Sequence, residues 1–460
     1  MDGSLLLEII LDSSASKSTL KEKKMDILFN PIIVSVIVLC ALCLFKLNVL
    51  LSLIIAAITA GLCGGLSISK TMELLANGFS ANATTALAYI LLGTFAIAIA
   101  RTGLMQMLVK WLSHHMGERP VVFCLTIAFI ACLSQNVVPV HIAFIPLLIP
   151  PLLVLMNKMQ LDRRAVACAL GFGLTAPYIS LPIGFGLIFQ GIVADSMTSS
   201  GMATTVDDVA SVAWILGLSM FAALLLAIFV FYRKPRQYQD LPVMGTEDMD
   251  NVETKFNFKH WMTLLAIVLA VVVQLVLESL PLAALMGLTI MIAGRAFRFN
   301  EIDKQVASGI SMMGFIAFVM LIAGGYAGIL KATGAVPTLI ESVVPYIGQN
   351  KWLAAIVINL IGLVVTMGIG TSFGTVPILA VFYVPLCAAV GFSAPATILL
   401  LTAAGALGDA GAPASDSTLG PTSGLNADGQ HSHIMDTCVP TFLVYNIPLM
   451  LAGVIAAQFI

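Results

Sequence analysis

The chain has 460 residues, of which 59% are apolar and only 10% are charged, with a formal net charge of −2. Soluble globular proteins carry roughly 25% charged residues, so this composition excludes a soluble domain. Together with a mean hydropathy of +1.01, it predicts an all-α polytopic membrane protein. The net charge indicates no particular partner, because the few charges cluster in loops.

Residues 1–24 differ from the rest of the chain. The lysine-rich stretch KSTLKEKK follows a short apolar run, whereas a secretory signal has its positive charge first. We interpret 1–24 as a flexible tail or as sequence upstream of a true start at Met25. Apolar runs then begin, and Pro31–Phe45 and Leu47–Gly65 approach the ~20 residues that a spanning helix needs.

A polar stretch at 233–261 interrupts the hydrophobic pattern. It contains ten charged residues and two prolines. This composition predicts a soluble connector between a first membrane repeat at 25–232 and a second at 262–460.

The two membrane parts resemble each other in sequence. At an offset of 231 residues, glycines and prolines of Ala76–Pro146 coincide with those of the second part, for example Gly93 with Gly324. Glycine and proline fix backbone shape, so this agreement predicts an internal duplication. Duplicated membrane halves are typical of secondary transporters, and we expect about 11–12 spans in two inverted repeats.

In each repeat, ordinary spans and a shorter amphipathic piece precede two apolar segments cut by proline, glycine and polar residues. The cuts fall at 134–146, 171–186, 366–377 and 407–438. Lipid cannot hydrogen-bond a free peptide group, so the cuts predict discontinuous helices or re-entrant hairpins that line a cavity. Close helix packing is the alternative use of the glycines, but four cuts in matched places favour a binding site.

Four aspartates stand near the end of the chain, where residues 352–460 contain no lysine, arginine or glutamate. Asp409 directly follows an apolar run and Asp416 comes seven residues later, so both are expected at membrane depth. Ionisable groups there are costly and usually functional. A bound Na⁺ or a proton would neutralise the two carboxylates, as a coupling site requires. The alternative for Asp409 is a helix N-cap.

Other polar residues give weaker indications. His141 lies between two prolines and is either a buried neutral histidine or a substrate- or proton-binding group. Thr175 is a further candidate in the 171–186 cut. The cysteines predict neither a disulfide framework nor a zinc site. We expect a solvated loop, and no metal site, from the remaining polar cluster of Asp428, His431, His433 and Asp436.

The stretch GDAGAPASDSTLGPTSGLNADGQHSHIMDTCVPTF at 408–442 resembles the C-terminal signature of the bacterial Na⁺/H⁺ antiporter family of the ion transporter superfamily. The segments MDILFNP, from Met25, and SQNVVPVHIAFIPLLIPPLL extend the resemblance over nearly the whole chain apart from 1–24. Some relatives are regarded as histidine or other amino acid permeases. The resemblance implies an inverted-repeat fold with two re-entrant hairpins, an elevator-like or rocking cycle, and a homodimer in the bacterial inner membrane.

The resemblance also implies a cation or substrate site at hairpin tips and unwound helices. Its members on this chain would be Ser134, Gln135, Asn136, Gly370, Thr371, Ser372, Asp409, Ser415, Asp416, Ser417 and Thr418. No cofactor is implied, and no metal beyond a transported Na⁺.

We therefore predict a secondary transporter that couples a Na⁺ or H⁺ gradient to solute movement, as a Na⁺/H⁺ exchanger. The alternative is a Na⁺- or H⁺-coupled permease for a histidine-like amino acid. A membrane-embedded enzyme is a distant alternative, because ALGDAG at 406–411 only partly matches an intramembrane aspartyl protease motif. The expected partners are the lipid bilayer and a small solute or ion, with no nucleic acid.

Overall fold

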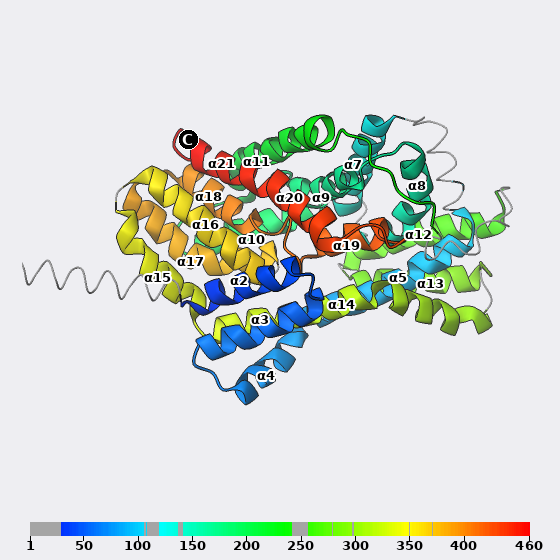
Figure 1. Cartoon of the computed structure of the whole chain (residues 1–460), viewed down its shortest axis with the longest axis horizontal. Helices are drawn as coiled ribbons and strands as arrows, with labels where there is room; N and C mark the ends of the chain where they lie inside the picture. Colours follow the sequence, from blue (N-terminus) through cyan, green and yellow to red (C-terminus); the bar gives the residue numbers. More distant parts are fainter. Residues whose placement is uncertain are drawn as a thin grey trace, which may run out of the picture.

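The computed structural model describes residues 29–104, 107, 119–136, 141–241, 256–277, 279–296, 299–348, 350–369 and 371–460. Within these ranges the chain forms helices and no strands, as the composition predicted. Figure 1 shows an elongated helical bundle, with α12 and α13 near one end and α15 and α17 near the other.

The part of the chain before the connector contains nine α-helices among the described residues, and three short 3₁₀ or π segments. These elements are α2 (Pro31–Leu44), α3 (Val49–Cys63), α4 (Ile68–Asn77), η1 (Gly78–Asn82), α5 (Ala83–Arg101), α7 (Pro120–Asn136), η2 (His141–Phe144), α8 (Ile145–Lys158), α9 (Arg163–Ser180), α10 (Phe185–Ser199), α11 (Val206–Leu226) and η3 (Ala227–Phe231).

The part after the connector contains one very long helix and several short ones near the C-terminus. These elements are α12 (Phe258–Leu277), α13 (Leu280–Ala293), η5 (Phe299–Glu301), α14 (Ile302–Ala332), α15 (Ala335–Ile347), α16 (Lys351–Ile369), α17 (Ser372–Val390), α18 (Ala394–Ala406), α19 (Asp416–Leu425), η6 (His433–Cys438), α20 (Val439–Thr441), η7 (Phe442–Asn446) and α21 (Ile447–Ala456).

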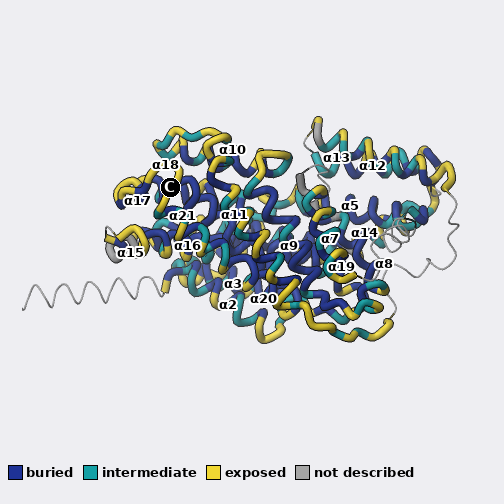
Figure 2. Tube along the Cα trace, turned by 90° about the horizontal axis from the view of Figure 1, so that it is seen from above, coloured by how far each residue is buried: buried dark blue, intermediate teal, exposed yellow. Residues whose placement is uncertain are grey.

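Helices from the two parts pack closely together. The long helix α14 lies along α5 and also contacts α3 and α4, and the α12–α13 hairpin packs on α5 (Figure 1). Helix α9 packs between α7 and α11, and α18 contacts α16, α17 and α11. Figure 2 shows buried residues along the middle of the bundle and exposed residues on its outer turns.

Six helical segments among the described residues are long and apolar enough to cross a membrane. Helices α9 and α10 together make a seventh candidate, bent by 47° at the break between them. The predicted 11–12 spans are therefore not reached by long helices alone. Seven further apolar helical stretches of 10–17 residues occur among the described residues.

Four pairs of helices begin at the same spacing in the two parts. Helix α13 begins 231 residues after α3, and α16 begins 231 residues after α7. The same spacing separates α9 from α18 and α10 from α19. This regularity agrees with the predicted duplication, but the duplication, its inversion and the domain boundaries stay predictions.

Two glycines allow α14 to approach the turn between α4 and α5. A Cβ atom added at Gly78 would lie 2.5 Å from the Cα of Gly325, and one added at Gly325 would lie 2.3 Å from the carbonyl oxygen of Leu75. Both distances are far below a van der Waals contact. Small residues permit such close approach in membrane proteins, where dispersion contacts hold helices together.

The close approach predicts that Gly325→Ala destabilises the protein although alanine is the better helix former. The added methyl group must push α14 away from the α4–α5 turn, which typically costs about 1–3 kcal/mol. Thermal unfolding of the purified protein in detergent measures this effect. The matched control is Gly328→Ala on the same helix, whose Cβ would meet the Cα of Gly78 at an ordinary 3.8 Å. Equal unfolding temperatures for both variants would contradict the packing argument.

Candidate functional site

The helix break at 407–415 depends on two glycines with left-handed backbone angles. Helix α18 ends at Ala406 and α19 begins at Asp416. Gly408 has φ +87° and Gly411 has φ +99°, a region that disfavours other residues. A Cβ at Gly408 would also lie 2.7 Å from the Leu363 carbonyl oxygen. The break is therefore a specific backbone path, as the sequence predicted.

Asn446 satisfies backbone groups that the break exposes. Its Oδ1 accepts a hydrogen bond from the Gly408 amide at 2.9 Å, and its Nδ2 donates to the Ala410 carbonyl at 2.7 Å. Asn446 is 2% exposed and ends the π-helical segment η7. One buried carboxamide thus replaces hydrogen bonds that a continuous helix would provide.

Asp409 lies within the break and is 7% exposed. Its Oδ2 accepts a hydrogen bond from the hydroxyl of Tyr178 on α9 at 2.8 Å, and its Oδ1 accepts one from Ser415 at 2.7 Å. The Tyr178 oxygen lies 2.8 Å from the hydroxyl oxygen of Ser372, the first residue of α17. Asp409 does not cap a helix, because the N-cap of α19 is Ser415.

The first turn of α19 is hydrogen-bonded to the break that contains Asp409. Ser415 accepts a hydrogen bond from the Ser417 amide at 3.2 Å, and the Ser417 hydroxyl donates to the Asp409 carbonyl at 2.9 Å. The Thr418 hydroxyl lies 2.6 Å from the Ala412 carbonyl. These bonds fix the path of the chain from the break into α19.

Asp416 is the first residue of α19 and faces a different helix. Its carboxylate accepts a hydrogen bond from the hydroxyl of Tyr89 on α5 at 3.1 Å. Tyr89 is fully buried, and a negative charge at a helix N-terminus is favourable. The two carboxylates of the break are therefore both held by tyrosines from the first part of the chain.

The rings of Tyr178, Phe189 and Phe373 pack together next to the Asp409 carboxylate, and we call them the apolar wall. The ring of Tyr178 lies 5.2 Å from that of Phe189 and 5.6 Å from that of Phe373, centroid to centroid. Phe189 and Phe373 also contact each other at 5.6 Å. The N-termini of α17 and α19 meet at this place through Ser372 and Ser415, which gives the site a positive dipole from two helix ends.

The structure thus joins Ser372, Asp409, Ser415 and Ser417 in one hydrogen-bonded group, with Asp416 and Thr418 on the adjoining turn. Thr371 is the N-cap of α17.

Other predicted members are not joined to this group by the hydrogen bonds described. Thr175 is fully buried on α9, and its hydroxyl has no hydrogen-bond partner among the described residues. Ser134 donates to the Ala131 carbonyl of its own helix at 2.8 Å. The side chains of Gln135, Asn136 and His141, and all of Gly370, lie outside the described residues. Their roles stay predictions.

The sequence interpretation missed Tyr89, Tyr178 and Asn446, although each gave a signal. A tyrosine hydroxyl in an apolar helix needs a partner, and an asparagine near the end of a span is costly without one. The sequence did not show which partner each would meet, because Tyr89 and Asp416 are 327 residues apart.

The other two aspartates of this region pair with arginines, which the sequence interpretation did not expect. The guanidinium of Arg163, fully buried, donates to both oxygens of Asp428 at 2.7 and 2.6 Å. Burial alone raises the pKa of the Asp428 carboxyl, but the hydrogen bonds and charge of Arg163 outweigh burial and hold that pKa below its ordinary value. This ion pair joins the start of α9 to the loop after α19.

The connector binds to the same region. Arg236 donates to Asp436 at 2.7 Å, and the Tyr238 ring lies 4.2 Å from the Arg163 guanidinium carbon. Gln239 and Gln430 exchange two hydrogen bonds at 2.8 and 2.7 Å. We call Arg163, Arg236, Tyr238, Asp428 and Asp436 the arginine cluster. Its contacts show that residues 236–239 lie against both membrane parts.

The prediction of a solvated histidine loop is wrong. His431 is 1% exposed, and its Nε2 lies 2.7 Å from the Thr437 hydroxyl oxygen. Burial lowers the pKa of His431, so the ring is neutral at physiological pH. His433 is partly buried and its Nε2 lies 2.9 Å from the Pro413 carbonyl, within the Asp409 break. The histidines are therefore structural supports of the break and its loop.

Broken apolar helices with buried carboxylates in the break are typical of polytopic membrane transporters. Residues 169–454 match a family model described as the Na⁺/H⁺ antiporter family, and residues 30–116 match a second one described as the Na⁺-H⁺ antiporter family. The chain belongs to the Na⁺/H⁺ antiporter family. It is a secondary transporter and a bacterial multi-pass membrane protein.

Similar proteins occur in distant bacteria. The chain is 45% identical to a Vibrio parahaemolyticus membrane protein over 441 residues, which is 93% of this chain and 99% of the relative. It is 44% identical over 443 residues to YuiF of Bacillus subtilis, named as a candidate amino acid transporter, with the same coverage. The solved Alcanivorax borkumensis YdaH transporter is 13% identical, with a TM-score of 0.45 over 85% of this chain and 88% of that one.

The arginine cluster predicts that Arg163→Met strongly destabilises the protein. Removing one partner leaves the Asp428 charge buried without its arginine, which typically costs about 3–5 kcal/mol. Unfolding in detergent measures the loss. The double variant Arg163→Met/Asp428→Leu removes both charges and is expected to be more stable than Arg163→Met alone. A double variant at least as unstable as the single would show that the pair does not act as a unit.

Proposed function

We propose that this transporter couples solute movement to Na⁺ or H⁺ through Asp409, whose carboxylate binds and releases the coupling cation. The observation that carries the proposal is the position of Asp409 in a helix break, buried and hydrogen-bonded by hydroxyls from α9 and from the turn leading into α19. Asp416, the first residue of α19, accepts a hydrogen bond from Tyr89 and is the second carboxylate of the proposed site.

Hydroxyl partners suit a cation site that must empty and refill. A hydroxyl group both donates and accepts hydrogen bonds, so Tyr178 and Ser415 can donate to the charged carboxylate. When a cation binds, the same oxygens can turn their lone pairs toward it, since hard cations prefer oxygen ligands. Serine oxygens from Ser372 and Ser417 lie within the same hydrogen-bonded group.

Exchange of Na⁺ for H⁺ is the first version of this function, because it is the activity after which the family is described. Symport of a small amino acid is the second version. The name of the Bacillus subtilis relative supports it, and so do the N-termini of α17 and α19, where an α-carboxylate would be stabilised.

The proposed cycle uses the two broken helix pairs as moving parts. The bend between α9 and α10 and the break between α18 and α19 meet at Tyr178 and Asp409. We propose that inverted repeats move this unit across the bilayer by an elevator-like or rocking motion, in a homodimer. The family resemblance supports both proposals.

Asp409→Asn is expected to abolish coupled transport while the protein still inserts and folds, because asparagine keeps the size but cannot bind and release a proton or neutralise Na⁺. Coupled transport is measured in proteoliposomes with an imposed Na⁺ or H⁺ gradient. One assay follows the Na⁺-dependent pH change, and a separate assay follows the uptake of labelled histidine. The control Asp207→Asn changes an exposed carboxylate in the first turn of α11 and should transport normally. An active Asp409→Asn variant would refute the coupling role.

Tyr178→Phe is expected to favour the protonated form of the site. It removes one hydrogen bond that stabilises the charged, cation-free carboxylate, worth about 1.5–3 kcal/mol, so the pH midpoint of transport should rise by about one unit or more. The same proteoliposome assay measures it. An unchanged midpoint would show that Tyr178 does not act on the cation site. Phe189→Leu, in the apolar wall but without a polar atom, is the packing control.

A further inference from the structure

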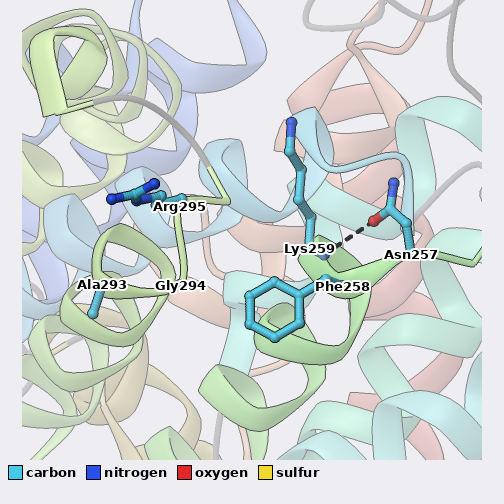
Figure 3. Close-up of a pocket in the computed structure, with 6 residues that line it drawn as sticks. All are labelled: Asn257, Phe258, Lys259, Ala293, Gly294 and Arg295. Atoms are coloured by element: carbon cyan, nitrogen blue, oxygen red, sulfur yellow. Dashed lines mark hydrogen bonds between the residues drawn. The ribbon is translucent and has the colours of Figure 1, made fainter.

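A pocket of about 530 Å³ opens where α12 begins and α13 ends, away from the Asp409 site. Its lining residues are Asn257, Phe258, Lys259, Ala293, Gly294 and Arg295. In Figure 3, Lys259 and Arg295 come from the two sides of the pocket and their charged ends point in different directions, with the Phe258 ring between the two helix ends.

The pocket carries two cationic side chains that form no ion pair with another described residue. Lys259 and Arg295 are both exposed, and no described carboxylate forms an ion pair with either. The amide of Lys259 is already satisfied by the Asn257 side chain at 3.0 Å. The charge offered by the pocket therefore comes from the ammonium and guanidinium groups, which suit a phosphate.

Aromatic side chains place this end of the hairpin at the membrane surface. Phe258 is 68% exposed and Trp261 is 64% exposed, in the first turn of α12. Phe256 stacks edge-on against Trp261 at 5.2 Å. Exposed aromatic residues at the end of an apolar helix are typical of the layer of lipid headgroups.

An apolar stripe runs from the pocket along α12. Its members are exposed and lie three or four residues apart, about one helical turn: Leu265, Val268, Val272 and Val276. The spacing puts all four on one face of the helix. A ligand with both a phosphate and a hydrocarbon chain would match the pocket and the stripe together, whereas free phosphate would match only the pocket.

We propose that this pocket binds the headgroup of an anionic phospholipid, with the exposed Lys259 and Arg295 side chains turning toward its phosphate and an acyl chain along the α12 stripe. Each basic group near the phosphate contributes about a fivefold preference for anionic over zwitterionic lipid. The hairpin packs on α5, and the His260 Nε2 lies 2.7 Å from the Thr102 carbonyl just after α5. The bound lipid would thus lie on the hairpin that packs against the helix that carries Tyr89.

Trp261 provides a direct test. In a variant with Trp111, Trp214 and Trp352 changed to Phe, the only tryptophan lies beside the pocket. This full-length variant is reconstituted in phosphatidylcholine vesicles that contain brominated phosphatidylglycerol or, at equal mole fraction, brominated phosphatidylcholine. We expect stronger quenching of Trp261 by the brominated anionic lipid. Lys259→Gln/Arg295→Gln should lower the preference roughly 25-fold, toward equal quenching.

The control Lys158→Gln/Lys331→Gln removes the same charge from exposed sites elsewhere and should keep the preference. Equal quenching by both lipids in the parent variant would overturn the proposal, as would equal preferences in the two double variants. Relief of quenching by added inorganic phosphate would show a soluble-anion site and would also overturn it. Gel filtration and the Trp261 emission in unbrominated vesicles confirm that each variant is folded.

Discussion

The structure depends on one constraint: where a helix breaks inside an apolar bundle, every freed polar group must find a partner within the protein. At 407–415 the chain meets this constraint with a few side chains. Asn446 bonds the backbone on both sides of Asp409, and Ser415 caps the helix that follows. Because these partners come from η7 and from the break itself, the geometry at Asp409 is fixed by its surroundings and not by local propensity.

The four aspartates of the C-terminal region divide into two kinds. Asp428 and Asp436 pair with Arg163 and Arg236, so their charges are compensated permanently and serve to join segments of the chain. Asp409 and Asp416 instead accept hydrogen bonds from neutral tyrosine hydroxyls. A hydroxyl stabilises a carboxylate without cancelling its charge. The two carboxylates proposed for coupling thus each have a tyrosine hydroxyl among their partners, and the two structural carboxylates each have an arginine.

Much of the fold and part of the site were predictable from the sequence. Glycine and proline marked the breaks, and the apolar run before Asp409 predicted its burial. The sequence could not show long-range partners, because nothing local links Arg163 to Asp428, 265 residues away. The prediction for the histidine loop was wrong for the same reason. Its polar composition resembled that of a surface loop, while Arg163 and Arg236, which bind its aspartates, lie far away in the chain. The number of spans, 11–12, stays a prediction, because long helices among the described residues give six or seven candidates and shorter apolar helices accompany them.

The attachment of residues 236–239 has a mechanical consequence. Arg236 holds Asp436, and Tyr238 covers the Arg163 that holds Asp428, so one short segment ties the start of α9 to the loop after α19. A motion that separates these two places must break the Arg163–Asp428 ion pair together with either the Arg236–Asp436 ion pair or the Tyr238–Arg163 cation–π contact. A motion that pivots about them keeps all three. We therefore expect residues 236–239 to lie at a pivot point, and displacements within the molecule should increase with distance from them.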